Sequence, residues 1–152
     1  MAAVLNPQWR MKNMRFMVIV KANRESEAGV LPTSEMLSKM MAFNEELVKA
    51  GIMLLGEGLQ PSSKGFRIKF AGTHRIVTEG PFAETKELVA GYWVWQTASR
   101  EEALEWAKRA PMEEGQELEI RQIYEASDFG DAFTPELQEK EEQLRAETAS
   151  RK

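Results

Sequence analysis

The hydrophobic pattern of the chain predicts a strand and then a helix in its first third. A run of large apolar residues begins at Met14 and reads M-R-F-M-V-I-V, which is typical of a strand. Pro32, Thr33 and Ser34 then open a helix in which apolar residues recur with a 3.6-residue period as far as Ala50, and Gly51 stands where a C-terminal cap belongs. The periodic positions of this predicted helix are Leu37, Met40, Met41, Leu47 and Val48.

The middle of the chain predicts four strands. Ile52 to Leu55 is a short, fully apolar run that ends in G-E-G, which indicates a strand leading into a bulge or turn. Phe66 to Phe70 and Thr73 to Thr78 alternate apolar and polar residues around Ala71-Gly72, a pattern that predicts a β-hairpin. Ala90 to Thr97 follows as a strand that is apolar on both faces. Its large side chains are Tyr92 and Val94 on one face and Trp93 and Trp95 on the other.

A second helix and a last strand complete the pattern. Ser99 and Glu102 form the S-x-x-E capping box of a helix that stops before Pro111, and Gln116 to Tyr124 has the pattern of a strand. The two halves of the chain therefore share a strand, helix, strand order. This order predicts an α+β fold of the ferredoxin-like type, a sandwich in which helices cover one face of an antiparallel or mixed sheet.

We expect one domain with an extension at each end. Met1 to Asn13 shows no sustained period and reads as an N-terminal extension, so the domain itself is expected to span residues 14–126. Residues 127–152 are expected to form a linker and a third helix. Its regular apolar anchors are Leu137 and Leu144 among many glutamates, which predicts a mostly solvated helix.

The strand from Ala90 to Thr97 also predicts an assembly. If helices cover one face of the sheet, either the two tryptophans or Tyr92 and Val94 remain on the other face, and an exposed aromatic patch of that size marks an interface. Two sheets packed face to face in a homodimer would bury this patch. The alternative is that the C-terminal helix folds over this face within one chain.

Composition narrows the function classes. The chain has 152 residues, of which 43% are hydrophobic and 29% charged, and this suits one soluble domain. A net charge of −4 without a Lys/Arg block argues against nucleic-acid binding, and the lack of a long apolar run or signal peptide predicts a cytoplasmic protein without a membrane span. With no cysteine and one histidine, no metal site or cofactor is predicted.

The run from Glu79 to Glu87 is the first candidate for chemistry. Gly80 and Pro81 allow a sharp turn, so that Phe82 can face inward while charged side chains line the rim. A carboxylate held by a turn beside an apolar residue can act as a general acid or base, and Glu79 is the best placed for this role. The alternative, which composition alone favours, is a structural loop.

Two polar groups near the first helix are candidates for ligand binding. Asn44 occupies the middle of the apolar stripe, where an amide must find partners or face a cavity. The connection from Glu57 to Lys64, which contains Gln60 and Ser62, has the composition of a Gly/Ser turn that can hold an anion through main-chain amides. Backbone partners for Asn44 and an ordinary surface loop are the alternatives.

Two further residues have ordinary structural explanations. His74 shares a predicted strand face with Ile76 and Thr78 and is a candidate general base, but near a hairpin turn a histidine is more often exposed. Arg121 lies among the glutamates of the last strand. We expect it to be a cross-strand ion-pair partner.

Several segments resemble the YCII-related, or DGPF, family of small bacterial proteins. They are M-R-F-M-V-I-V-K-A from Met14, F-N-E-E-L-V-K-A-G from Phe43, G-E-G-L-Q-P-S-S-K-G from Gly56, and the run from Thr78 through Gln96, which contains the G-P-F turn. The resemblance implies a ferredoxin-like unit that dimerises into an α/β barrel. It also implies a pocket built around His and Asp in the broader family, an activity on small organic acids in a few members, and a link to sigma factors of the extracytoplasmic class.

This chain departs from the family pattern at the residues that would carry acid–base chemistry. Glu79 replaces the signature Asp, and Gln60 stands where close relatives have His. On the first helix, Met40, Met41 and Asn44 occupy the region where shorter relatives place a His.

The residues and the resemblance together predict a homodimer that binds a small polar or anionic molecule between its sheet and first helix. If the protein is an enzyme, Glu79 is the predicted general acid or base. The predicted ligand-binding residues are Asn44, Glu57, Gln60, Ser62 and Phe82. The alternative is a non-enzymatic regulatory or interaction protein, for example a partner of an extracytoplasmic sigma factor.

Overall fold

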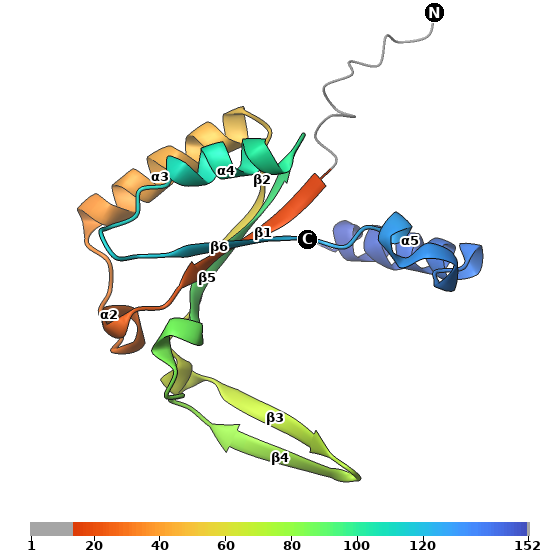
Figure 1. Cartoon of the computed structure of the whole chain (residues 1–152), viewed down its shortest axis with the longest axis horizontal. Helices are drawn as coiled ribbons and strands as arrows, with labels where there is room; N and C mark the ends of the chain where they lie inside the picture. The colour runs from red at the N-terminus through yellow and green to blue at the C-terminus, as the bar shows by residue number, and fades with distance from the viewer. Residues whose placement is uncertain (1–13, 152) are drawn as a thin grey trace, which may run out of the picture. The chain divides into compact units, whose positions relative to one another are not determined.

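The computed structural model describes residues 14–151, and the expected extension from Met1 to Asn13 lies outside this range. The chain divides after Gln122 into two compact units. The first unit holds the strands and the helices that pack on them, and the second holds the C-terminal helix (Figure 1). Each unit is described by itself.

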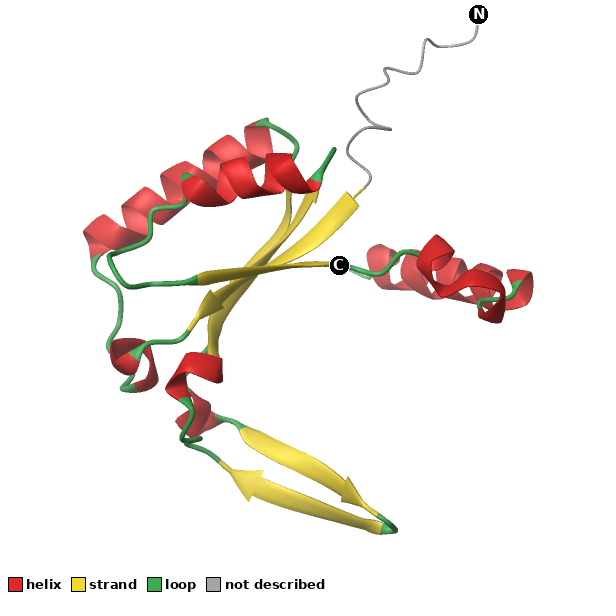
Figure 2. Cartoon of the chain, in the orientation of Figure 1, coloured by secondary structure: helices red, strands yellow, loops and turns green. Residues whose placement is uncertain are grey.

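The first unit is built on a four-stranded antiparallel sheet with the strand order β2-β5-β1-β6. Its strands are drawn in yellow in Figure 2. Two helices connect these strands and lie on one face of the sheet (Figure 1). This order with two helical crossovers confirms the predicted ferredoxin-like α+β fold. The elements are β1 (Met14–Lys21), α3 (Ser34–Lys49), β2 (Met53–Gly58), β5 (Val89–Thr97), α4 (Arg100–Lys108) and β6 (Leu118–Gln122).

The two covering helices begin at the residues that the sequence indicates. The Thr33 hydroxyl accepts a hydrogen bond from the backbone N–H of Met36 at the start of α3. At the start of α4, the Ser99 hydroxyl accepts from the N–H of Glu102, whose carboxylate in turn accepts from the N–H of Ala98. The bonds from Met36 and Glu102 satisfy backbone donors that a helix leaves unpaired in its first turn.

Aromatic side chains of β5 fill the core beneath the helices. Trp93 and Trp95 are 4% and 0% exposed, and the ring centroid of Phe43 on α3 lies 5.9 Å from that of Trp93 and 6.3 Å from that of Trp95. Both pairs meet edge to face, the geometry that aromatic quadrupoles favour. Val18, Leu47 and Ile52 complete the buried cluster.

The opposite face of the sheet carries the other residues of each strand. Side chains alternate along a strand, so Tyr92 and Val94 lie on the face away from the tryptophans. Their cross-strand partners on β1 are Ile19 and Met17, and Val94 also pairs with Leu55 of β2. We call these five residues the second sheet face. Its charged neighbours include Glu57, opposite Tyr92, and Glu119, opposite Ile19.

The predicted hairpin is present, but it is not part of this sheet. β3 (Phe66–Ala71) and β4 (His74–Glu79) form a separate two-stranded ribbon that turns at Gly72. The ribbon projects from the end of the main sheet, between β2 and β5 (Figure 1). The chain therefore inserts a ribbon between the second and third strands of the ferredoxin-like unit.

Two local predictions differ from the structure, and one short helix was not predicted. The G-E-G segment does not leave the sheet: β2 continues through Gly58, and the irregularity in its pairing comes earlier, between Met53 and Leu55. The last strand is shorter than predicted, since β6 ends at Gln122. The short helix α2 (Arg24–Glu27), which Asn23 caps, was not predicted.

The second unit consists of the short helix η3 (Ala126–Ala132) and α5 (Pro135–Ser150). The ring of Phe129 lies 5.0 Å from that of Tyr124 and 5.7 Å from that of Phe133. The hydroxyl of Thr134 caps α5, whose residues are all at least partly exposed. Within residues 14–151, no helix is both long and apolar enough to cross a membrane.

Truncating Leu47 should expose how much of the fold depends on α3. Leu47 is 0% exposed, so we expect Leu47→Ala to lower the free energy of unfolding by about 2–5 kcal/mol, through lost burial and a cavity. Val48 is 61% exposed on the same turn, and Val48→Ala should change stability by less than about 0.5 kcal/mol. Urea unfolding of both variants measures the difference. Equal losses would contradict the assignment of the buried face.

Candidate functional site

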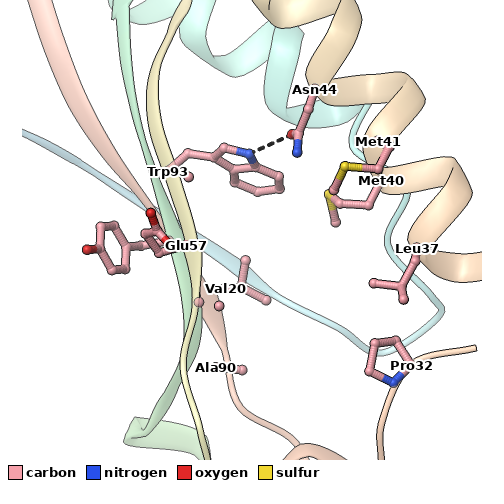
Figure 3. A pocket seen from close by; sticks show the side chains of 13 residues that line it. Val20, Pro32, Leu37, Met40, Met41, Asn44, Glu57, Ala90 and Trp93 are labelled. Carbon is pink, nitrogen blue, oxygen red and sulfur yellow. Dashed lines mark hydrogen bonds between the residues drawn. The ribbon is translucent and has the colours of Figure 1, made fainter. Parts of the chain in front are cut away.

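A cavity of about 350 Å³ lies between α3 and the edge of the sheet formed by β2 and β5. Its volume is within the range that holds a small ligand. Apolar side chains form most of the wall, from the helix on one side and the sheet on the other (Figure 3). These side chains are Val20, Pro32, Leu37, Met40, Met41 and Trp93.

The sheet side of the pocket is open because its strands carry residues with little or no side chain. Gly56, Gly58 and Gly91 line the pocket together with Ala90. A Cβ atom on Gly56 would lie 2.9 Å from Cδ1 of Trp93, so glycine is required there for the indole ring to keep its place. A Cβ atom on Gly58 would meet nothing within 4 Å.

Asn44 supplies the polar side chain of this pocket. Its Oδ1 accepts a hydrogen bond of 2.9 Å from the indole Nε1 of Trp93, and its amide stands over the space between Trp93 and Met40 (Figure 3). Among the described residues, no hydrogen bond to the Nδ2 group of Asn44 is present. The bond from Trp93 occupies the Oδ1 side of the amide, so the two N–H donors of Nδ2 remain for a ligand.

The ionisable side chains at the rim do not face the cavity. Glu57 lines the pocket through its place on β2, but its carboxylate points to the opposite side of the strands from Trp93 (Figure 3). Tyr92 pairs with Glu57 and alternates with Trp93, so it faces the same way. The described lining residues include no lysine or arginine. The pocket therefore suits a largely apolar molecule with one hydrogen-bond acceptor.

The residues that the sequence nominates do not meet at one place. Asn44 and Glu57 line the pocket, whereas Gln60, Ser62, Glu79 and Phe82 do not. Glu79 lies at the end of β4 and is exposed. The geometry thus favours Asn44 over Glu79 as a residue that contacts a ligand.

Ser62 and Phe82 belong instead to a hydrogen-bonded junction at the base of the ribbon. The backbone N–H of Phe82 donates to the hydroxyl of Ser62 over 3.1 Å. The hydroxyl and the backbone N–H of Ser62 both donate to the carboxylate of Glu27 on α2, the latter over 3.0 Å. We call these three residues the Glu27 junction. The pattern of the sequence did not single out Glu27.

Gly80 packs against the same junction. Its N–H donates to the carbonyl of Gly65 over 2.9 Å, and a Cβ atom on it would lie 1.8 Å from the carbonyl oxygen of Ser62. The guanidinium of Arg67 lies 3.7 Å from the ring centroid of Phe82, a favourable cation–π contact. The G-P-F turn therefore fits the structural alternative: it fixes the two ends of the ribbon to the domain.

The remaining polar candidates have no catalytic geometry. His74 is exposed at the tip of the ribbon. The cross-strand ion pair on the last strand is made by Glu119, whose carboxylate lies 3.6 Å from Nζ of Lys21, and not by Arg121. Within the part of the chain that the structure describes, no cluster of three or more metal-ligating side chains is present.

A second hollow of about 470 Å³ lies near the end of β1 and is polar. Its charged lining consists of Lys21, Lys86, Glu87, Glu117 and Glu119. Carboxylates outnumber ammonium groups there, which disfavours an anion. This hollow is a weaker candidate than the pocket under α3.

The strand order and the covering helices define a ferredoxin-like α+β protein with a pocket between helix and sheet. The model of the YCII-related domain matches residues 14–127, so the chain belongs to this family, as its sequence motifs predict. An uncharacterized protein of Rhizobium meliloti (strain 1021) is 33% identical over 69 residues, which are 45% of this chain. The match spans about half of that relative, 56% of its length.

A methyl group at Gly80 should weaken the attachment of the ribbon. Because it would overlap the Ser62 carbonyl, we expect Gly80→Ala to lower the free energy of unfolding by about 1–3 kcal/mol. Gly58→Ala is the matched control, since the added methyl group enters open space and should cost nothing measurable. Thermal unfolding followed by circular dichroism compares the two variants. A Gly80→Ala variant as stable as the control would show that the turn is loosely packed.

Proposed function

We propose that this YCII-related protein is a homodimer that binds a small molecule in the pocket beneath α3. The observation that carries the proposal is the amide of Asn44, which the Trp93 indole orients and which keeps its N–H donors toward an otherwise apolar cavity. A polar group in such a place needs a partner, and a bound ligand supplies one.

The lining selects a ligand with an apolar body and one carbonyl or similar acceptor. Methionine side chains at positions 40 and 41 adapt to irregular shapes, which suits a hydrophobic ligand of moderate size. The sequence predicted a polar or anionic ligand. An anion gains little here, because the described lining offers an amide and no cation.

Binding is better supported than acid–base catalysis. A general acid or base must reach the reacting atom within hydrogen-bond distance. The carboxylate of Glu57 points away from the cavity, and Glu79 does not line it (Figure 3).

The homodimer part of the proposal rests on the second sheet face. Tyr92, Val94 and Met17 form an apolar strip on the side of the sheet that α3 and α4 leave free. Two such strips placed face to face would bury each other, as in the α/β barrel expected from the family.

A regulatory or interaction protein is the second candidate, with a partner such as an extracytoplasmic sigma factor. The observation in its favour is that the G-P-F turn serves the Glu27 junction, which is a structural role. In that case the pocket would hold no ligand.

Native mass spectrometry of the protein purified without denaturation tests for a bound molecule. We expect a mass above that of the chain, and we expect Gly58→Leu to reduce its occupancy by at least about tenfold, since the added side chain enters the pocket. Glu57→Gln, on the neighbouring residue but facing away, is the control and should keep the ligand. Mass spectrometry of the molecule released in organic solvent would then identify it.

Two results would sink the binding proposal. One is a protein that carries no additional mass and shows no occupancy of the pocket. The other is a ligand that persists in the Gly58→Leu variant, because that ligand would lie elsewhere.

A further inference from the structure

The β3–β4 ribbon has one largely apolar face, which also carries Glu79 opposite Phe66 and Arg75 opposite Phe70, with the Arg75 guanidinium 4.5 Å from the centroid of the Phe70 ring. Phe66, Ile68 and Phe70 alternate along β3 and lie on this face, and Val77 is the cross-strand partner of Ile68. Their exposed fractions are 61%, 48%, 71% and 57% in that order. We call these four residues the arm face.

The opposite face of the ribbon is mainly polar. Arg67, Lys69, His74 and Thr78 lie there, with Ile76 as its large apolar member. The ribbon is therefore amphipathic, as a strand pair that packs on one side should be. Among the described strands, β3 and β4 pair only with each other, so both outer edges are unpaired as well.

A free two-stranded ribbon of this kind is marginally stable in water. Exposed apolar surface that is continuous over several residues marks an interaction site. The ribbon nevertheless has a firmly attached base, because the Glu27 junction and the Gly80–Gly65 hydrogen bond hold both of its ends. The ribbon therefore has the form of an arm that projects from the domain.

Charge favours a second copy of the chain as that molecule. Residues 66–79 contain Arg67, Lys69 and Arg75 but one carboxylate, Glu79, whereas the whole chain has a net charge of −4. The remainder of each copy is thus more acidic than the whole, and its opposite charge favours contact with a cationic arm. The segment from Met1 to Asn13 carries Arg10 and Lys12 and no carboxylate, so like charge disfavours it as the cover.

The arm face also offers apolar area to a dimer interface. A buried aromatic side chain contributes about 150–250 Å², and each partner in a standard interface buries about 800 Å². Phe66 and Phe70, which are 61% and 71% exposed, therefore supply part of such an interface. A two-fold axis makes each contact twice.

We propose that the arm face packs against a second copy of this chain, and that the second copy returns the same contact with its own arm. This inference rests on the homodimer in the proposed function and adds a second contact beside the sheets. The arm face is then buried in the dimer, whereas it is exposed in a single chain.

Sedimentation velocity over a dilution series compares two variants that place serine on opposite faces of the ribbon. Phe70→Ser/Val77→Ser removes apolar groups from the arm face, and we expect it to weaken dimerisation by at least about tenfold. Ile76→Ser changes the neighbour of Val77 on the opposite face, which is 49% exposed, and should leave the dimer intact. Because these side chains are exposed in one chain, both variants should fold, as circular dichroism will verify.

Hydrogen exchange gives a second readout that needs no mutation. The amide protons of β3 and β4 should become protected as the protein concentration rises through the dimerisation range. Protection that does not change with concentration over the dimerisation range would overturn the inference.

The outcomes separate this inference from the proposals on which it rests. A wild-type monomer at all concentrations would overturn both the homodimer and the arm contact. A dimer that Phe70→Ser/Val77→Ser leaves as stable as the wild type would overturn the arm contact alone. A dimer weakened equally by Ile76→Ser would also overturn it, since the wrong face would then carry the contact. None of these results affects the mass measured for a ligand.

Discussion

The packing of Trp93 between α3 and β2 is the contact on which both the core and the pocket depend. One edge of its ring meets Phe43 in the buried cluster, and the indole nitrogen holds Asn44 at the pocket. Gly56 leaves room for the ring on the sheet, and no larger residue could take its place without moving it. The ring thus borders both the core and the pocket, so the stability of the fold and the shape of the pocket are coupled. A pocket built against a core in this way is largely formed before a ligand arrives.

The parts of the fold that depend on local pattern could be predicted from the sequence. The period of α3, the caps at Thr33 and Ser99, and the alternation in the hairpin are all set by residues a few positions apart. What the sequence missed depends on distant partners. The G-E-G segment remains a strand because it pairs with β5, and the hairpin stands apart from the sheet because β5 takes the place beside β2. Tertiary pairing overrides local turn chemistry at such positions.

The candidate site likewise combines features set by nearby residues with features set by distant ones. Asn44 could be found from the sequence because a polar residue in the middle of an apolar stripe is visible in the helical period. Its partner could not, since the Trp93 indole lies 49 residues further along the chain. Glu79 was chosen because it precedes the G-P-F turn, but Phe82 of that turn bonds to Ser62, which in turn bonds to Glu27, 35 residues before Ser62. A sequence motif can thus mark residues that hold the fold together as readily as residues that take part in a reaction.

The hydrogen bond between Gly80 and Gly65 has a consequence for how this domain can vary. The ribbon begins and ends at two backbone positions that are hydrogen-bonded to each other. The residues from Phe66 to Glu79 therefore form a closed loop that projects from the domain. Adding or removing residue pairs at its tip would alter the reach of the ribbon without shifting the register of β2 against β5, and longer loops cost little in closure entropy. The tip at Gly72 is therefore the natural place to lengthen, shorten or graft a peptide while the rest of the domain keeps its architecture.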